Sequence, residues 1–495
     1  MSDVSIPMIF DDCFSKHCAV AWRVEPGKLD PHNPLMTGQH PWDGAHPFYL
    51  GTVLKDPIDG QWKSWGIAAP IEEPHEQWSF RCAYATSADG VHWERPRLAG
   101  FPCLGQERTN VLMDFPDGGS CYQMSVLVDP AACPERRYEM FILRQPAFKN
   151  PTKRIKDLPL LPHHKNYWGE PAHPFGVYRY FSPDGIHWKI SEGPLLIQSN
   201  DSLYVYKDLG APYVAYHKLE VPTPPGSAYV PHDYAKGGIR RLVRRESQDG
   251  THWSDPPLPV MVPDWRDAHD TQFMDIGPIR EGSGFVATVA VFHGLNQMMD
   301  IQFTGSRDGK TWFRPIPRVP CVPNGALGEY GGGHIFQSRA FVPEGDKLHL
   351  YYAGDTGLHT DIYSEDPRRG PGPSLYGGLC RATWERGRLW ALAPAFGGPR
   401  EGHATARPIP GCTGKSLFIN ALTLDDGEVS AELCTGNEWD VGAPFEGYSR
   451  ADCVPFRGDS KCTKLVWKTS DRCPREGLLL RFHLRRARLY GFEWR

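Results

Sequence analysis

The chain has 495 residues, which corresponds to two to four ordinary domains or to one long all-β unit with an addition. It has 54 Lys and Arg against 58 Asp and Glu, and a net charge of −4 gives no electrostatic reason to expect nucleic acid or an anionic membrane as partner. Aromatic residues are numerous (16 Trp, 20 Tyr and 23 Phe), and 51 Gly with 47 Pro supply many turns. This composition favours an all-β protein whose ligand is a neutral or modestly polar small molecule.

The N-terminal stretch and the cysteines indicate the cellular compartment. Asp3, Asp11 and Asp12 fall where a secretory signal would need a basic segment followed by an apolar run, and no later segment offers about 18 uninterrupted apolar residues. The 13 cysteines include no C-x-x-C pair, which argues against a disulfide framework and a zinc site. We therefore expect a cytoplasmic protein with mostly buried thiols and no membrane partner.

One pattern, Ser-x-Asp-Gly-x-x-Trp, occurs four times, beginning at residues 87, 182, 247 and 306. Each copy separates two alternating runs, which predicts a β-hairpin with an Asp-Gly turn. A degenerate fifth hairpin is expected at residues 378–393, where Glu385-Arg-Gly replaces the turn and Trp390 falls on the returning strand. The interval between copies is typical of a four-stranded propeller blade.

Two further strands are predicted before each hairpin. In chain order they cover residues 46–56 and 60–68, 120–130 and 136–145, 202–208 and 211–218, 271–279 and 284–294, and 332–344 and 346–355. Five units of four strands predict a five-bladed β-propeller over residues 1–400. A β-sandwich with long insertions is the alternative, but it does not explain why the same hairpin recurs at the same place in each unit.

From residue 401 to 495 the alternating strands continue without the hairpin pattern. They predict a small C-terminal β-sandwich, so the fold class is all-β: a five-bladed β-propeller followed by a sandwich. Four arginines alternate with apolar residues between Arg481 and Arg488. We interpret this run as the charged outer face of an edge strand.

The repeated hairpins, together with the C-terminal segments "LFINALT", "GEVSAEL", "GYSRADC" and "LRFHLRRARLYGFEW", resemble the five-bladed propeller glycoside hydrolases, the clan of glycoside hydrolase families 32 and 43 and their bacterial relatives. The resemblance covers nearly the whole chain and implies cleavage of glycosidic bonds in the central pocket. The chain lacks the "NDPNG" and "EC" motifs, and "RDP" is absent, so families 32 and 68 themselves match poorly.

Candidate catalytic residues are acids that precede the inner strands, because a propeller forms its pocket where those strands begin. Glycoside cleavage needs one carboxylic acid and a second carboxylate. The resemblance implies that Asp43, in "QHPWDGAHPFYL", is the base or nucleophile and that Asp201, in "QSNDSLYVYKD", occupies the position of an acidic catalytic residue. A simple turn at Asp43-Gly44 and a strand cap at Asp201 are the alternatives.

Two further acids complete the catalytic set. The stretch "WRDAHDTQFMD" brings Asp267, His269 and Asp270 within four residues, and a carboxylate beside an imidazole can tune a proton donor, which favours Asp270 as catalytic. Glu329 lies among glycines that allow a backbone to approach a ligand closely, and we expect it to be catalytic too. Glycines serve turns equally well.

Four other residues are predicted to bind the substrate: Trp42, which could stack on a sugar, Asp114, His269 and His334. The hairpin aspartates Asp89, Asp184, Asp249 and Asp308 are expected to be structural instead, because an active site is one place whereas the hairpin is repeated four times.

The sequence therefore predicts a glycoside hydrolase with a carbohydrate substrate, no cofactor and no metal; a structural or substrate-orienting cation in the channel is the alternative. Two other functions stay open. A glycoside phosphorylase would need a cationic phosphate pocket, to which Arg240, Arg241, Arg244 and Arg245 could contribute. A non-catalytic carbohydrate-binding propeller would only hydrogen-bond sugars. A homo-oligomer also stays open.

Overall fold

The computed structural model describes residues 6–44, 49–68, 71–72, 77–78, 80–113, 119–146, 148–149, 176–196, 202–207, 212–222, 238–359 and 377–495. Within these ranges the structure is almost entirely β, with one short 3-10 helix at Pro134–Arg136. None of the helical structure in the described ranges is long and apolar enough to cross a membrane.

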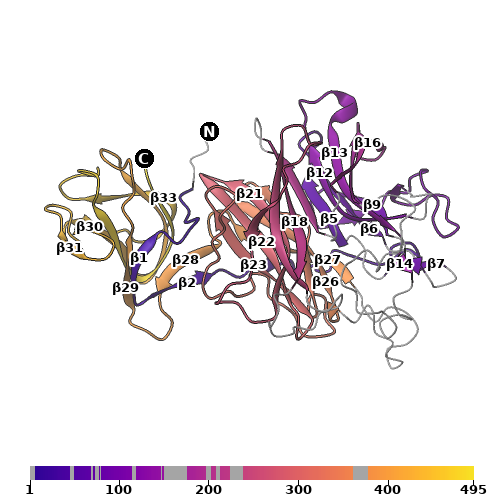
Figure 1. Ribbon diagram of the computed structural model, residues 1–495. Coiled ribbons are helices and arrows are strands. Elements are labelled where there is room, and N and C mark those ends of the chain that lie inside the picture. The colour runs from indigo at the N-terminus through magenta and orange to yellow at the C-terminus, as the bar shows by residue number, and fades with distance from the viewer. Residues whose placement is uncertain are drawn as a thin grey trace.

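Five β-sheets form a propeller, and the sandwich lies on one side of it (Figure 1). The inner strands line the central channel and contact one another around it. They are β5 (Tyr49–Lys55), β12 (Gly119–Val128), β17 (Leu203–Lys207), β21 (Thr271–Glu281) and, in the fifth blade, β24 (Ile335–Gln337) with β25 (Val342–Glu344). The five-bladed fold expected from the sequence is confirmed.

The second and third strands of each blade lie where the sequence predicted them. The second strands are β6 (Trp62–Ala68), β13 (Tyr138–Pro146), β18 (Tyr213–Pro222), β22 (Gly284–His293) and β26 (Lys347–Asp355). The third strands are β9 (Arg81–Ser87), β15 (Gly176–Ser182), β19 (Gly238–Ser247), β23 (Met298–Ser306) and β27 (Gly377–Glu385). Outer strands are β10 (Trp93–Glu94), β16 (Lys189–Leu196) and β20 (Leu258–Met261) in the first three blades, and an isolated bridge between Gly305 and Phe313 in the fourth. Short additions are β11 (Val111–Met113), β7 (Ile71–Glu72), β8 (Gln77–Trp78) and β14 (Phe148–Lys149).

The fifth blade is closed by the N-terminus and not by the degenerate hairpin. Its outer strands are β3 (Lys28–Leu29) and β4 (Met36–Thr37), which pair with β27. The returning strand β28 (Trp390–Pro394) leaves the blade and pairs with β2 (Val20–Val24) of the sandwich. The sequence expectation for this strand was therefore wrong, and the ring is closed by joining the two ends of the propeller chain.

The four Asp-Gly hairpins share one set of contacts. In the first, the hydroxyl of Ser87 accepts the N–H of Gly90 at 2.9 Å, and Asp89 accepts the N–H groups of Val91 and His92 at 2.8 Å. Gly90 has φ +74°, a conformation that a residue with a Cβ adopts at a cost. The other copies repeat these bonds, so the hairpin aspartates satisfy their own turns.

Each hairpin is also tied to the blade before it. Side chains of the preceding blade donate hydrogen bonds to hairpin carbonyls, and the four pairs are Tyr351 to Gly90, Trp65 to Gly185, Arg179 to Asp249 and Tyr216 to Gly309. The hairpin tryptophans pack edge-on against rings of that blade, as in Trp93 on Tyr351, Trp253 on Phe141 and Trp312 on Tyr216. The repeated motif therefore fixes the spacing between blades.

Polar side chains link the five inner strands in a closed ring around the axis. The links are 2.8 to 3.4 Å long and join Thr52 to Met124, Ser125 to Leu203 and Val205, Ser202 to Asp275, Asp275 to Arg339, and Ser338 to Gly51. Buried polar groups need such partners. We call this set of links the inner ring.

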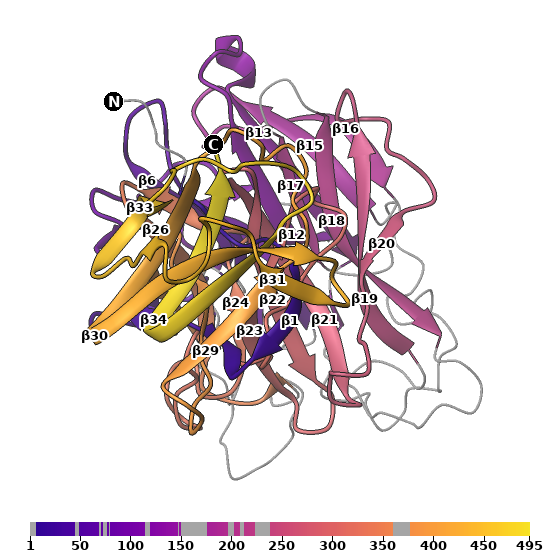
Figure 2. The ribbon, with the colours of Figure 1, turned by 90° about the vertical axis from the view of Figure 1, so that its left-hand side faces the viewer.

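The C-terminal sandwich takes strands from both ends of the chain (Figures 1 and 2). Its strands are β1 (Phe14–Cys18), β2, β28, β29 (Glu401–Ala406), β30 (Leu417–Gly436), β31 (Val441–Pro444), β32 (Cys453–Val454), β33 (Asp459–Trp467) and β34 (Leu479–Trp494). The two long strands, β30 and β34, pair along both halves around an irregularity between Thr423 and Glu428, where strands can turn from one layer into the other. A division at residue 400 does not include β1, β2 and β28, which belong to this sheet.

Strand β34 is central in the sheet, so the expectation that Arg481–Arg488 form an edge strand was wrong. The strand pairs with β29 on one side and β30 on the other. Its arginines ion-pair with acids of neighbouring strands and loops, including Arg481 with Glu432 and Arg488 with Glu25. The alternating arginines therefore indicate ion pairs with neighbouring strands and loops, and not the solvent-facing side of an edge strand.

One hydrophobic core continues from the sandwich into the fourth and fifth blades. Trp390 of β28 is buried, donates its indole N–H to the carbonyl of Ile9 at 2.9 Å and packs against Phe303 of β23. Trp22 of β2 contacts Phe313 in the same way. The propeller and the sandwich therefore share one apolar core.

All thirteen cysteines are free thiols.

Candidate functional site

The inner strands all begin at the same end of the channel, which we call the entry end; the opposite end is the far end. Loops that lead from an outer strand to the next inner strand cross the entry end, including residues 262–270 before β21 and residues 314–334 before β24. Most of the acids predicted from the sequence belong to such loops.

Asp275 lies in the inner ring and is buried, with 1% of its surface exposed. Its Oδ1 accepts hydrogen bonds from the Ser202 hydroxyl at 3.1 Å and from the N–H of Ile276, and its Oδ2 is 3.2 Å from the guanidinium of Arg339. Burial raises the pKa of Asp275 although Arg339 and these hydrogen bonds oppose the change. Asp275 is therefore a carboxyl that keeps its proton to a higher pH than usual.

Two buried cations lie on the entry side of the third blade, and both face the fourth blade. Lys218 of β18 has its Nζ 3.7 Å from the sulfur of Met274, and the guanidinium of Arg240 in β19 lies over the ring of Phe292 at 5.2 Å. The neighbouring His217 is no third cation, because burial and the charge of Arg245 lower the pKa of His217 to about 4. Lys218 and Arg240 therefore place two positively charged groups at the interface between the third and fourth blades.

Asp270 stands directly before β21 and is largely buried. Its Oδ2 accepts the N–H of Leu295 at 2.9 Å, and its carbonyl accepts the N–H of Gly294 at 3.0 Å. These bonds hold the turn between β22 and β23. In the described part of the chain, Oδ1 of Asp270 has no hydrogen-bond partner, which leaves it able to bind a ligand hydroxyl.

His334 lies on the other side of the same turn. Its Nε2 is 2.5 Å from Oδ2 of Asp355, and its Nδ1 is 3.3 Å from the carbonyl of Gly357. Both ring nitrogens of His334 therefore face oxygen acceptors. His359, whose N–H bonds the carbonyl of Gln297, lies 5.6 Å from the His334 ring. The turn at Gly294–Gln297 thus joins the surroundings of Asp270 and His334.

Asp43 and Trp42 are packed into the structure and away from this cluster. Oδ2 of Asp43 accepts N–H groups of Gln39 and His40 and pairs with Arg95 at 2.5 Å. Trp42 is 1% exposed and donates its indole N–H to Asn110 at 2.7 Å. Neither side chain presents a free face to a sugar, and these contacts are those of a turn, the alternative that the sequence left open for Asp43.

The other predicted residues are scattered. His269 and Glu329 are exposed on the entry end, and Glu329 accepts the N–H of Ala326 at 3.1 Å within its own turn. Asp114 and Asp201 lie outside the described residues. The structure therefore brings together Asp270 and His334 from the predicted set, joined by the turn at Gly294–Gln297.

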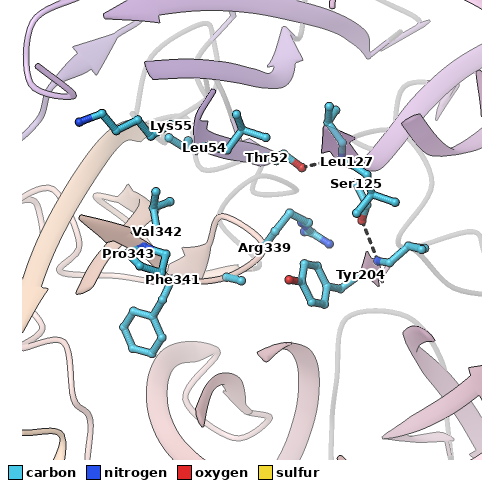
Figure 3. Close-up of a pocket in the computed structure, with 14 residues that line it drawn as sticks. Thr52, Leu54, Lys55, Ser125, Leu127, Tyr204, Arg339, Phe341, Val342 and Pro343 are labelled. Atoms are coloured by element: carbon cyan, nitrogen blue, oxygen red, sulfur yellow. Dashed lines mark hydrogen bonds between the residues drawn. The ribbon is translucent and has the colours of Figure 1, made fainter. Parts of the chain in front are cut away.

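A cavity of about 240 Å³ lies at the far end (Figure 3). It is lined by the later parts of β5, β12 and β17 and by the segment from Arg339 to Pro343. Arg339 lines this cavity, and its guanidinium lies 3.2 Å from Asp275. Its described lining includes no carboxylate, so this cavity does not meet the needs of acid-base cleavage.

No group of three or more His, Cys, Asp and Glu in the described ranges is placed to hold a metal ion. The predicted Asp267-His269-Asp270 group is divided, because Asp267 pairs with Arg314 and Arg318 while His269 is exposed.

The sequence did not single out Asp275 or Lys218. Asp275 follows a β-bulge, where the register between β21 and β22 shifts between Phe273 and Asp275. An alternating pattern through residues 271–279 gives no sign of that shift, and the buried Asp in an apolar strand was the one available signal.

No family model and no curated protein matches the chain. Solved structures similar to it include one described as a glycoside hydrolase, 11% identical with a TM-score of 0.46, covering 76% of this chain and 92% of that one. An N-acetylgalactosamine deacetylase from F. plautii in complex with blood group B trisaccharide is 14% identical, with a TM-score of 0.46 and coverage of 75% and 97%. A β-1,2-mannobiose phosphorylase from Listeria innocua is 13% identical, with a TM-score of 0.46 and coverage of 73% and 97%. These names state three different reactions, and the chain's own residues carry the function proposed below.

Proposed function

We propose that this protein cleaves a glycosidic bond of an oligosaccharide or glycoside at the entry end of the propeller channel. The observation that carries the proposal is Asp275, a carboxyl of the inner ring whose pKa burial raises. Glycoside cleavage needs an acid that is still protonated near the working pH in order to protonate the leaving oxygen. Asp275 would supply that proton.

The second carboxylate must come from another strand. Asp270 directly precedes β21 and Asp275 lies five positions further along the chain, so their Cα atoms are up to about 16 Å apart at 3.3 Å per residue, whereas the two carboxyls of a glycosidase are about 5 to 9.5 Å apart. We assign this role to Asp201, which precedes Ser202 in the sequence, and Ser202 bonds Asp275. Asp270, with one open oxygen, would bind a sugar hydroxyl nearer the mouth.

Hydrolysis of a broad panel of aryl glycosides and oligosaccharides tests this assignment. Asp275→Asn and Asp201→Asn are expected to lower kcat/KM by about 10²- to 10⁴-fold, the usual contribution of a general acid or base. Asp308→Asn, in a hairpin of the same blade as Asp275, is the matched control and should keep wild-type activity. A folded Asp275→Asn protein with wild-type kcat/KM would contradict the proposal.

A glycoside phosphorylase is the second candidate, and the buried pair Lys218 and Arg240 favours it. Two cations facing one blade interface could bind the phosphate that replaces water as the attacking group. Turnover measured with and without inorganic phosphate separates the two reactions. A phosphorylase requires phosphate and releases a sugar phosphate, whereas a hydrolase is indifferent to it.

A further inference from the structure

A fully exposed tryptophan stands on the loop that leads to Asp270. Trp265 is 85% exposed, although other tryptophans of this protein, such as Trp62, Trp65 and Trp390, are buried almost completely. The loop runs from the end of β20 to the start of β21 across the entry end. Trp265 and Asp270 are five positions apart in the chain, so their two Cα atoms are at most about 18 Å apart.

The turn that carries Trp265 is fixed at both ends. The N–H of Asp264 donates to Oδ2 of Asp267 at 2.9 Å, and the N–H of Asp267 returns to the carbonyl of Asp264 at 3.0 Å. The N–H of Arg266 donates to Oδ1 of Asp264 at 2.8 Å. Trp265 therefore stands at the tip of a closed four-residue turn.

Two arginines from the following segment clamp this turn. Arg318 makes two bonds to Asp264 at 2.6 and 2.8 Å and reaches Asp267 at 2.7 Å, while Arg314 holds Asp267 with bonds at 2.6 and 3.1 Å. The hydrogen bonds from Arg318 lower the pKa of Asp264 to about 2, so Asp264 stays charged across the ordinary pH range. Bidentate pairs of this kind hold a fixed geometry.

The clamped turn leaves the indole of Trp265 exposed to water. The guanidinium of Arg266 covers one part of the ring at 4.8 Å from its centre. Near Asp270 a second apolar side chain, Leu295, is 67% exposed, and its N–H bonds Asp270. A rigid exposed aromatic ring binds a partner at low entropic cost, because its orientation is set beforehand.

We infer that Trp265 is a stacking platform for a sugar ring of the substrate, outside the residues that carry the cleavage chemistry. This inference rests on the proposed function and extends it: the substrate is an oligosaccharide that continues from the channel mouth past Asp270 to Trp265. A glycoside with a single sugar would fill the channel and leave the platform empty. Sugar faces offer C–H groups to an aromatic ring, and Arg266 beside it can donate to a hydroxyl.

Binding to a printed array of oligosaccharides of two to six units, with the matching monosaccharides, tests this platform. Trp265→Ala is expected to weaken binding of the longer glycans about three- to tenfold and to leave monosaccharide binding unchanged, and Trp265→Phe should restore part of the loss. Trp439→Ala is the matched control, because Trp439 is 84% exposed on a sandwich turn.

Three results would overturn the inference, and they have different meanings. Unchanged glycan binding by Trp265→Ala removes the platform and leaves the proposed function standing. Wild-type protein that binds no glycan at all removes the proposed function and the platform with it. Self-association of the wild type that Trp265→Ala abolishes, measured by sedimentation without glycan, would show that the ring contacts a second copy of this chain instead.

Discussion

At the scale of single residues, aspartate has opposite properties at two places in this fold. Hydrogen bonds from the side chain and backbone of His252 and from the Thr251 N–H lower the pKa of Asp249 in its exposed hairpin. Burial raises the pKa of Asp275 on the axis. The same residue type is therefore a permanent carboxylate in the hairpins and a proton donor candidate in the channel.

Ser202→Ala tests the assigned role of Asp275 through pH. The Ser202 hydroxyl stabilises the carboxylate form of Asp275, so its removal should raise the pKa of Asp275 further. A general acid must be protonated to act, and activity is lost as pH rises through its pKa. The alkaline limb of the kcat/KM profile should therefore move to higher pH in Ser202→Ala. An unmoved limb would mean that Asp275 is not the acid.

His293 gives a second pH prediction, on stability. Its hydrogen bond to Asp300 at 2.6 Å, together with the charges of Asp300, Asp270 and Asp267, raises the pKa of His293 although burial opposes this. A raised folded pKa stabilises the fold below about pH 6.5, and that contribution is lost as pH rises through the folded value. We expect His293→Gln to lose about 1 to 2 kcal/mol at pH 6 and little at pH 9. Urea unfolding at both pH values measures the difference, and an equal loss at both would contradict it.

At the scale of elements, the hairpins are predicted to contribute to stability by joining blades. Tyr216 donates its hydroxyl to the carbonyl of Gly309 in the next blade, at 2.5 Å, and is buried. Tyr216→Phe keeps the ring and removes this bond, so it should cost about 1 kcal/mol of unfolding free energy. Tyr330→Phe, on an exposed loop, is the control and should change little. Equal stability of the two variants would show that the bond between blades contributes nothing.

The elements that could be predicted from the sequence are those whose signal is local. Each hairpin carries its turn, glycine and tryptophan within seven residues, and all four were placed correctly. The closing strands β3 and β4 are two residues long and pair with β27 more than 340 positions away. No periodicity marks so short a strand. The position of β28 likewise depends on a distant partner, because it pairs with β2 near the N-terminus.

The site shows the same division. Asp270 and His334 were predicted because they precede inner strands, and in the structure they stand directly before β21 and β24. Asp275 could not be predicted, because its position depends on a β-bulge and its buried contacts are with Ser202 and Arg339 from other strands. Asp43 looked similar to Asp270 in sequence, but its Oδ2 pairs with Arg95, 52 positions later, and only 1% of the residue is exposed. Partners distant in the sequence therefore determine whether each of these aspartates has an oxygen that a ligand could reach.

At the scale of the whole molecule, the sandwich depends on strands outside residues 401–495. β1, β2 and β28 pair within its sheet, and Trp390 joins its core to the fourth blade. A fragment of residues 401–495 would expose that core, so we expect it not to fold, as shown by circular dichroism and poor dispersion in NMR spectra. The full chain should unfold in one calorimetric transition. A folded fragment would show that residue 400 is a true boundary.

The central claim is that a carbohydrate is bound and cleaved at the entry end of the channel. The most direct measurement is a crystal structure of Asp275→Asn with an oligosaccharide substrate that the wild type cleaves. We predict a glycosidic oxygen about 3 Å from the residue at position 275, with an outer sugar beside Asp270. A sugar in the far-end cavity lined by Thr52 and Arg339, or one at the entry end beyond reach of both Asp270 and position 275, would contradict the account.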